Sequence, residues 1–346
     1  VKMIDKKIVK VGINGFGRIG RTIFRQIREL EGFEVVQIND LNSDIHNICY
    51  LLNYDSVHGT LSNKAEVKKD SILVDGTSTK VSSSILITDA GWDKQGVDIL
   101  IESSGYKPNI PIIRKCLTGT VKKVLFSDSP EGMDITISNG ANEYDYDHSN
   151  HHIVSSSICD VIGTAPVLRL IEDEYGIESA FLQTLHPWLN YQNIMDGSLN
   201  TDVIQDPQGK AYGIGRASAS NLIPKNTSLG KALLKVLPSL EGKISSMSYR
   251  VPTEIIGSCS MVLDLNKKTN TENVKKFLKK SENIPILAIS DDPIVSIDVK
   301  HHESSCVLDL RWVEVLNNKL RLVTWYDNEW GYVNRLIENL KRISGD

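Results

Sequence analysis

The chain has 346 residues, and its 39 lysine and arginine residues nearly balance its 43 aspartate and glutamate residues, which leaves a formal net charge of −4. This balance, without a basic block, argues against a nucleic acid or an anionic membrane surface as the main partner. No apolar run approaches the ~20 residues that cross a bilayer, and the first residues lack the apolar core of a signal peptide. We therefore expect a cytoplasmic protein, long enough for two domains.

The cysteine and histidine residues give no sign of a metal site. The five cysteines are scattered and show no C-x-x-C spacing: Cys49, Cys116, Cys159, Cys259 and Cys306. This pattern favours reduced thiols over a disulfide scaffold or a zinc site. The adjacent pairs His151-His152 and His301-His302 do not chelate by themselves on a strand, where neighbouring side chains point to opposite faces. We predict surface histidines and no metal.

The first predicted element is a strand at 7–13, which leads through a G-x-G-x-x-G turn into a helix over 21–30. In such a turn Gly15 allows the tight bend, Gly17 lets the backbone approach a pyrophosphate, and Gly20 lets the helix pack on the strand. The same glycines could also form a strand-to-helix turn without a ligand. The context of strand, turn and helix favours a dinucleotide site.

An acidic residue closes the second strand of this unit. Asp40 can bind the adenosine ribose hydroxyls and repel a 2′-phosphate, so NAD is favoured over NADP. A surface aspartate without a ligand is the alternative. With the glycines, the predicted cofactor site includes Phe16, Arg18 and Ile19 from the turn.

Up to residue 150, short apolar runs alternate with amphipathic segments, which is typical of a doubly wound parallel sheet. The predicted strands are 7–13, 33–39, 71–76, 83–89, 97–103, 122–128 and 134–140. Ser103 and Ser104 lie at the end of one strand and Ser127 at the end of another, where cofactors bind in open parallel sheets. Ordinary turn chemistry would explain the same serines.

Beyond residue 160 the pattern predicts an α+β domain with a mixed or antiparallel sheet and one helical face. Its predicted helices are 165–176, 228–240 and 332–343, and its strands are 178–186, 244–251, 259–265, 306–315 and 320–327. The polar stretch 187–215 shows little periodicity. A loop of that length is usually part of an interface or an active site.

Several motifs now point to one family. In order, they are NGFGRIGR (14–21), YDSVHG (54–59), ESSG (102–105), Cys159, His186, SYRVPTE (248–254) and WYDNEWGY (325–332). Their order and spacing closely resemble glyceraldehyde-3-phosphate dehydrogenase over essentially the whole chain. The resemblance implies a Rossmann NAD-binding domain over 1–158, a catalytic domain over 159–332, a C-terminal helix, 333–346, that packs on the first domain, and a homotetramer.

The resemblance also implies a reaction. In that family a cysteine thiolate attacks an aldehyde to form a thiohemiacetal, hydride passes to NAD, and inorganic phosphate releases the acyl thioester. Cys159 matches the nucleophile and His186 the base that favours its thiolate, with help from a nearby helix N-terminus. Taken alone, Cys159 could be a buried structural thiol and His186 a core histidine with its hydrogen bonds satisfied. Asn328 matches the asparagine that holds the nicotinamide carboxamide, although a turn asparagine is the alternative.

The chain departs from the family around its cysteine. The family motif S-C-T-T-N-C becomes Ile158-Cys159-Asp160-Val161-Ile162-Gly163, so the hydroxyls that flank the nucleophile and help bind phosphate are lost. A carboxylate there repels phosphate by about 4 kcal/mol at ~4 Å and an effective dielectric of 20. It also opposes thiolate formation. The alternative is an Asp160 that is solvated or caps the helix, away from the site.

The residues expected to bind the substrate's own phosphate are partly changed. The threonine that the family has three positions after His186 is Leu189, and the threonine or aspartate two positions further is Tyr191. Thr227 and Arg250 match the family's phosphate-contacting pair, and an arginine can bind an anion through two hydrogen bonds. A structural salt bridge is the alternative for Arg250.

From these observations we expect an NAD-dependent oxidoreductase that acts on a phosphorylated aldehyde such as glyceraldehyde 3-phosphate and releases the product with phosphate. One alternative is a related dehydrogenase for another aldehyde, with release by water, which the residues at 160, 189 and 191 favour. A second alternative is an NAD-binding protein without turnover. The predicted partners are the aldehyde and inorganic phosphate.

Overall fold

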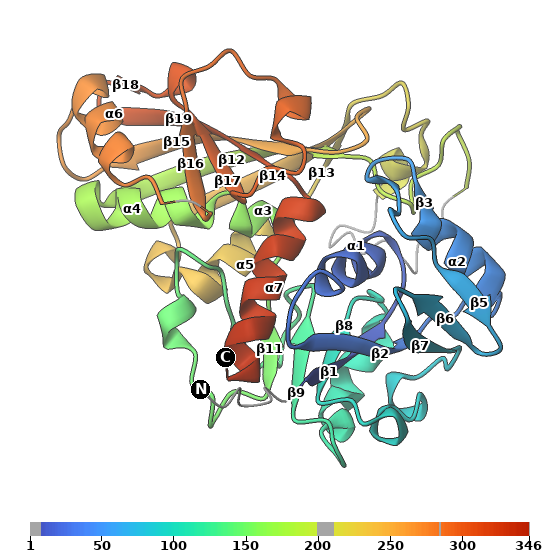
Figure 1. Ribbon diagram of the computed structural model, residues 1–346. Helices are drawn as coiled ribbons and strands as arrows, with labels where there is room; N and C mark the ends of the chain where they lie inside the picture. Colours follow the sequence, from blue (N-terminus) through green and yellow to red (C-terminus); the bar gives the residue numbers. More distant parts are fainter. Residues whose placement is uncertain (1–7, 199–210, 284, 346) are drawn as a thin grey trace. The chain divides into compact units, whose positions relative to one another are not determined.

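The computed structural model describes residues 8–198, 211–283 and 285–345 (Figure 1). It divides into two compact units. The first comprises Val1–Ile137, Tyr144–Ser157 and Val333–Asp346, and the second Ser138–Glu143 and Ile158–Tyr332. Relative to the predicted boundaries, the second unit begins one residue earlier and also takes 138–143. Among the described helices, none has the length and hydropathy of a membrane span.

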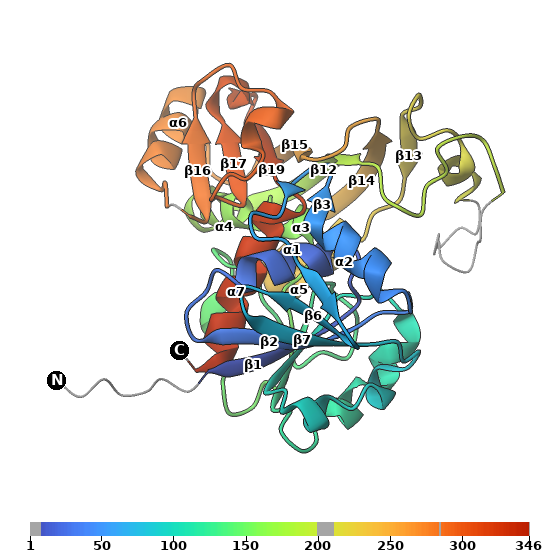
Figure 2. The same cartoon turned by 45° about the vertical axis from the view of Figure 1, so that its right-hand side comes forward.

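The first unit contains a nine-stranded sheet in the order β10-β11-β9-β8-β1-β2-β7-β6-β5. Its parallel strands are β10 (Ile135–Thr136), β11 (Ile153–Ser155), β9 (Lys123–Phe126), β8 (Ile99–Glu102), β1 (Val9–Asn14), β2 (Phe33–Asn39) and β7 (Thr77–Ser82); β6 (Ser71–Val74) and β5 (Glu66–Lys68) extend it antiparallel. Figure 2 shows β1, β2, β7 and β6 as neighbours. Strands β8 and β9 are buried throughout, as both faces of a parallel sheet are when helices cover them. The predicted Rossmann sheet is confirmed.

Short helices and a hairpin connect these strands. They are α1 (Arg18–Ile27), α2 (Ile45–Asn53), the hairpin of β3 (Tyr54–Asp55) and β4 (Gly59–Thr60), and the 3₁₀ helices η1 (Ile87–Asp89), η2 (Trp92–Gln95), η3 (Lys107–Cys116) and η4 (Glu143–Asp145). Asp44 caps α2 by accepting hydrogen bonds from two amides of its first turn. The C-terminal helix α7 (Trp330–Ser344) joins the first unit from Val333 onward, where the Asn339 amide donates to Ser156 Oγ at 3.2 Å.

The predicted strand at 83–89 is wrong. Strand β7 ends at Ser82, and the chain then turns into η1. The apolar run that suggested a strand buries only Ile87, which packs against Trp92, whereas Ile85 is 65% exposed. A short apolar run without alternation does not identify a strand by itself. Strand β11, in turn, lies in a stretch where no strand was predicted.

The second unit contains an eight-stranded mixed sheet, in the order β13-β14-β12-β15-β19-β17-β16, with β18 paired to β19. Its strands are β12 (Ile177–Pro187), β13 (Ile223–Lys225), β14 (Ile244–Val251), β15 (Gly257–Leu265), β16 (Leu287–Ser290), β17 (Cys306–Asp309), β18 (Glu314–Leu316) and β19 (Lys319–Tyr326). The predicted strand 306–315 is interrupted, because Asp309 accepts a hydrogen bond from the Arg311 amide and starts a 3₁₀ turn. The predicted mixed sheet is confirmed.

Helices cover one face of this sheet (Figure 1). They are α3 (Cys159–Ile162), α4 (Ala165–Tyr175), α5 (Leu229–Val236) and α6 (Thr271–Lys280). The unit also contains the 3₁₀ helices η5 (Ala211–Gly215), η6 (Pro238–Leu240), η7 (Ser296–Val299) and η8 (Leu310–Trp312). Leu168, Leu233 and Val274 of these helices share a core with Met261 and Leu322 of the sheet, all of them almost fully buried. This core holds the carboxyl end of β12 and the start of α3 in fixed positions.

Candidate active site

In the first unit, the three glycines between β1 and α1 have different surroundings. Gly15 adopts φ +89°, and a Cβ there would lie 2.3 Å from Ser104 Cα, so only glycine fits. A Cβ on Gly20 would lie 2.1 Å from the Gly15 carbonyl oxygen. A Cβ on Gly17 would meet no atom of the described residues within 4 Å. Two glycines therefore close the turn, and the third leaves open space at the start of α1, where a pyrophosphate fits.

Asp40 lies against this turn. One of its carboxylate oxygens accepts a hydrogen bond from the Phe16 amide at 2.6 Å, and the other accepts one from the Asn42 amide at 2.9 Å. The contact brings the end of β2 to the glycine turn, so the carboxylate lies beside the space next to Gly17. This is where the sequence predicts contact with the ribose.

Arg18 and Ile19, the first residues of α1, are half-buried. Both terminal nitrogens of Arg18 donate to Asp55 at 3.2 Å. Burial opposes ionisation of Asp55, but the amide of His58 and the Arg18 charge hold the pKa of this carboxyl at about 2. Arg18 is thus held in an ion pair that fixes α1, a role that sequence reasoning did not assign.

The three serines at the strand ends make structural hydrogen bonds. Ser103 Oγ donates to the Gly15 carbonyl at 2.8 Å, and Ser104 donates its amide to Glu102 at 2.8 Å and its hydroxyl to the same oxygen. Ser127 Oγ donates to the Glu102 carbonyl at 3.2 Å. These contacts order the strand ends that flank the glycine turn.

Glu102 is a residue that sequence reasoning missed. It is buried at the end of β8, and its carboxylate accepts hydrogen bonds from Asn14 at 2.7 Å and Asn109 at 3.0 Å as well as from Ser104. Burial raises the pKa of this carboxyl, although each of these hydrogen bonds opposes the rise. The sequence did carry a signal for this buried carboxylate, because Glu102 ends the otherwise apolar strand sequence ILIE.

The contrast between the glycines leads to a prediction. Replacing Gly17 by alanine is expected to leave the free energy of unfolding unchanged, because its φ of −69° suits any residue and its Cβ meets nothing. The methyl group would fill the space that we assign to the pyrophosphate, so NAD should bind roughly tenfold more weakly or worse. Calorimetric titration with NAD and unfolding in urea measure the two effects.

The matched control is Gly20→Ala, whose methyl group would collide with the Gly15 carbonyl. It should cost about 1–3 kcal/mol of stability. If Gly17→Ala binds NAD as tightly as the unmodified chain, the pyrophosphate does not approach the backbone there.

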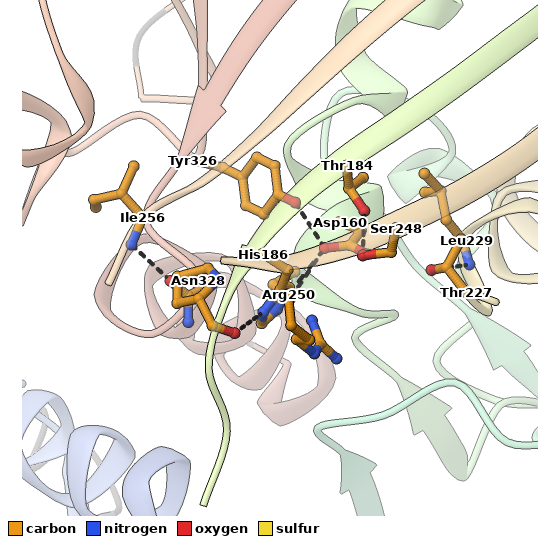
Figure 3. Close-up of polar contacts among 12 residues, drawn as sticks. Asp160, Thr184, His186, Thr227, Leu229, Ser248, Arg250, Ile256, Tyr326 and Asn328 are labelled. Atoms are coloured by element: carbon orange, nitrogen blue, oxygen red, sulfur yellow. Dashed lines mark hydrogen bonds and ion pairs between the residues drawn. The ribbon is translucent and has the colours of Figure 1, made fainter. Parts of the chain in front are cut away.

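In the second unit, Cys159 and His186 form the centre of the candidate site (Figure 3). Cys159 is half-buried at the first residue of α3, and His186 is buried near the carboxyl end of β12. The Cys159 Sγ lies 3.5 Å from His186 Nε2. The other ring nitrogen, Nδ1, lies 2.8 Å from the Pro187 carbonyl oxygen, which only accepts hydrogen bonds. We therefore assign the proton to Nδ1, which leaves the Nε2 lone pair facing the thiol.

Asp160 belongs to the same cluster. It is 5% exposed, and its Oδ1 lies 3.6 Å from Cys159 Sγ and 4.0 Å from His186 Nε2. The hydroxyl of Tyr326 donates to the same oxygen at 2.7 Å (Figure 3). Asp160 does not cap a helix, because Ile158 occupies the cap position of α3. Asp160 is therefore neither solvated nor a helix cap, the alternative that the sequence left open.

Tyr326 is fixed by close packing. It is fully buried, and a Cβ on either Gly163 or Gly257 would lie 2.4 Å from its ring. The two glycines let the ring fit between α3 and β15, which aims its hydroxyl at Asp160. Sequence reasoning included Tyr326 only as part of a family motif and gave it no role.

Burial and charge set the protonation of the cluster. Burial and the neighbouring Asp160 carboxylate raise the pKa of the Cys159 thiol, against the opposing charge of Arg250. Burial and Arg250 lower the pKa of His186 to about 4, against Asp160. At neutral pH the cluster therefore holds a thiol beside a neutral imidazole, whereas the family resemblance implies a thiolate favoured by His186.

Arg250 is the register partner of His186 in the parallel pair of β12 and β14, and Figure 3 shows it beside that histidine. The guanidinium is buried, donates to Tyr191 Oη at 3.3 Å, and has no carboxylate partner among the described residues. Its Nε also lacks a hydrogen-bond partner there. The salt-bridge alternative thus finds no support in the described part of the chain.

The other predicted substrate residues are placed differently. Thr227 lies at the start of α5, where its hydroxyl accepts a hydrogen bond from the Leu229 amide at 3.2 Å, apart from Arg250 in Figure 3. Leu189 is half-buried, and its amide donates to Gln192 at 2.8 Å. Of the long polar stretch, residues 199–210 lie outside the described part of the chain.

Asn328 makes a long-range contact. Its side-chain oxygen accepts a hydrogen bond from the Ile256 amide at 2.9 Å, and the residue is 6% exposed. Ile256 adopts φ +75°, which is strained for a β-branched residue. The contact comes from the residue directly before β15 and orients the Asn328 amide across 72 residues of sequence, so Asn328 is more than a local turn asparagine.

Comparison with known proteins agrees across both units. Residues 9–109 match the family described as glyceraldehyde 3-phosphate dehydrogenase, NAD binding domain, and residues 158–328 match its C-terminal domain. The chain is 36% identical over 340 residues to the glyceraldehyde-3-phosphate dehydrogenase of Priestia megaterium, covering 97% of this chain and 98% of the relative. It is 36% identical to glyceraldehyde-3-phosphate dehydrogenase 1 of Bacillus subtilis, with 95% and 96% covered. It is 34% identical to the cytosolic glyceraldehyde-3-phosphate dehydrogenase of Chlamydomonas reinhardtii, with 95% of each covered.

Proposed function

The chain belongs to the glyceraldehyde-3-phosphate dehydrogenase family of NAD-dependent aldehyde dehydrogenases, and we propose that it oxidises a phosphorylated aldehyde such as glyceraldehyde 3-phosphate through Cys159. The observation that carries the proposal is the 3.5 Å contact between Cys159 Sγ and the unprotonated Nε2 of His186. A nucleophile and a base in this arrangement are the minimum that covalent aldehyde oxidation requires.

The reaction begins with a proton transfer. As Sγ bonds to the aldehyde carbon, its proton passes to Nε2 and then to the carbonyl oxygen, which becomes the hydroxyl of a thiohemiacetal. The residues around Gly17 and Asp40 would hold NAD, which would supply the acceptor for the hydride that leaves this carbon. His186 takes the hydroxyl proton as a carbonyl forms again, now as a thioester. The oxygen of phosphate or water then bonds to the acyl carbon, the C–S bond breaks, the proton on His186 returns to sulfur, and the proton of the attacking phosphate or water passes to solvent.

The His186 pKa of about 4 leaves the imidazole free to accept a proton but makes it a weak base toward the Cys159 thiol, whose own pKa is raised. At neutral pH the imidazole is almost entirely unprotonated and can accept the thiol proton. The negative charge of Asp160, 4.0 Å away, stabilises the imidazolium while it exists.

Arg250 supports a phosphorylated substrate. A buried guanidinium without a carboxylate partner among the described residues, beside the catalytic pair, is suited to bind an anionic group. Replacing Arg250 by glutamine should raise KM for glyceraldehyde 3-phosphate by about tenfold to a hundredfold, since a hydrogen bond to a charged group contributes ~1.5–3 kcal/mol. Turnover of both glyceraldehyde 3-phosphate and unphosphorylated glyceraldehyde should be followed as NADH formation.

The unphosphorylated aldehyde serves as the internal control. Loss of the Arg250 charge raises the pKa of the Cys159 thiol, and this affects both substrates equally. The ratio of their kcat/KM values therefore isolates the contact between Arg250 and the substrate phosphate. Arg250→Lys should recover part of the loss. An unchanged ratio in Arg250→Gln would point to the alternative, an unphosphorylated aldehyde, which Leu189 and the Tyr191 hydroxyl on Arg250 also favour.

The release step is the second part of the proposal. We expect slow phosphorolysis, with hydrolysis as the competing route, because Asp160 stands 3.6 Å from the sulfur that carries the acyl group. Assay of the product as acyl phosphate or free acid distinguishes the two routes.

For assembly, we propose the homotetramer of the family. The uncovered face of the second unit's sheet exposes neighbouring apolar side chains, among them Phe181 and its register partner Val262, at 65% and 39%. Exposed apolar groups of this kind commonly mark contacts with another chain. We also propose a cytosolic location, as the name of the Chlamydomonas relative states for that protein. Analytical ultracentrifugation tests the tetramer.

A further inference from the structure

We propose that the cluster of Cys159, Asp160 and His186 is a binding site for a zinc-type divalent cation, which would block the enzyme reversibly. Within the described residues these three side chains are the group whose possible ligand atoms converge, all lying within 4.8 Å of one another. They supply a thiolate, a carboxylate and an imidazole, each of which is a common zinc ligand.

The distances between the atoms fit tetrahedral coordination. Bond lengths of ~2.3 Å to sulfur and ~2.1 Å to nitrogen and oxygen place sulfur about 3.6 Å from each of the other two atoms, and nitrogen about 3.4 Å from oxygen. The structure has 3.5 Å from Sγ to Nε2, 3.6 Å from Sγ to Oδ1 and 4.0 Å from Nε2 to Oδ1. A small rotation of the carboxylate or the ring would complete the fit.

The surrounding contacts orient the three ligands. The Pro187 carbonyl holds the proton of His186 on Nδ1, so Nε2 presents its lone pair. Tyr326 holds the Asp160 carboxylate by a hydrogen bond at 2.7 Å. Metal-binding histidines and carboxylates typically have such outer partners, which fix the tautomer and the direction of the ligand.

The charges of the ligands also favour a divalent cation at this site. A divalent cation between the Cys159 thiolate and the Asp160 carboxylate forms a neutral group, and the thiol proton passes to solvent as the metal–sulfur bond forms. The family motif has threonine at position 160, so the third ligand is a departure of this chain from that motif. Arg250 opposes a cation, and we expect an anion from solution, such as chloride, as the fourth ligand. Cys159 is half-buried, in contrast to the buried Asp160 and His186.

The test is titration of the full chain, after treatment with a chelator, with Zn²⁺ by calorimetry and with Co²⁺ by absorption. One ion per chain and a thiolate-to-cobalt charge-transfer band are expected. Asp160→Asn keeps the shape but loses the charge, and should bind Zn²⁺ about a hundredfold more weakly; Tyr326→Phe removes only the outer contact and should lose about tenfold. His148→Gln, at an exposed histidine of the first unit, should bind as the unmodified chain does.

The outcomes separate cleanly. Binding that is unchanged in Asp160→Asn, that disappears in His148→Gln, or that gives no thiolate band overturns the proposal. Unfolding in urea, followed by the fluorescence of the second unit's tryptophans, among them Trp312 and Trp325, shows whether each variant is folded, and Asp160→Thr replaces Asp160→Asn if that variant is not. Inhibition of turnover by Zn²⁺ and its reversal by a chelator rest on the proposed function. Metal binding without any aldehyde oxidation would contradict that function and leave the metal site standing.

Discussion

Replacing Cys159 by serine is expected to reduce turnover by roughly a thousandfold or more, the scale of loss seen when a catalytic nucleophile is removed. A serine hydroxyl is a far weaker nucleophile, and the hydroxyl oxygen cannot form the thioester. NAD affinity should stay within about twofold, because the glycine turn belongs to the other unit and does not include this residue. Steady-state NADH formation and calorimetric NAD titration measure the two effects.

Alkylation gives an independent readout. The other four cysteines, Cys49, Cys116, Cys259 and Cys306, are buried. Burial raises the pKa of Cys116 and Cys306 to about 12 and shields their thiols from the reagent. The Cys159 thiol also has a raised pKa, but Cys159 is only half-buried and lies against the base His186, so iodoacetamide should label it first, and loss of activity should parallel that label.

Two results would contradict the mechanism. Substantial turnover by Cys159→Ser would exclude the thiohemiacetal. An unmodified chain that binds NAD and is labelled at Cys159, yet oxidises no aldehyde, would favour the alternative of an NAD-binding protein without turnover.

Local sequence signals predicted the first unit well. The glycine turn, the strand before it and the acidic residue after the second strand are all short-range features, and the structure places Asp40 against this turn, at the Phe16 amide. Prediction failed where burial is decided by distant residues. The run at 83–89 is apolar, but only Ile87 finds a buried position, next to Trp92.

The residues of the candidate site could be identified from the sequence, but their arrangement in space could not. Asp160 was recognised as a departure beside the nucleophile, but its direction depends on Tyr326, which is 166 residues away in the chain. The position of Tyr326 depends in turn on Gly163 and Gly257, which admit its ring. No local pattern encodes such a contact, and therefore solvation, capping and burial against the thiol all remained open.

Asp160 also determines the second large effect that we expect. Replacing it by threonine should lower the phosphate concentration for half-maximal rate by at least tenfold, equivalent to ~1.4 kcal/mol. The carboxylate lies 3.6 Å from the sulfur that carries the acyl group. At ~6 Å from it, an attacking phosphate would be repelled by about 3 kcal/mol at an effective dielectric of 20. Rates measured against phosphate concentration, with the product identified, give the effect.

Asp160→Asn distinguishes charge from hydrogen bonding. If both variants lower the phosphate requirement, repulsion is the cause; if only threonine does, the restored hydroxyl is the cause. Both should also react with iodoacetamide at lower pH than the unmodified chain, because the Asp160 charge helps raise the pKa of the Cys159 thiol and its removal lowers that pKa. Saturation of the unmodified enzyme at low phosphate, unchanged in both variants, would mean that the attacking phosphate approaches from a side that Asp160 does not face. If only the pH dependence of iodoacetamide labelling then shifts in the variants, Asp160 affects the pKa of the Cys159 thiol and not the binding of phosphate.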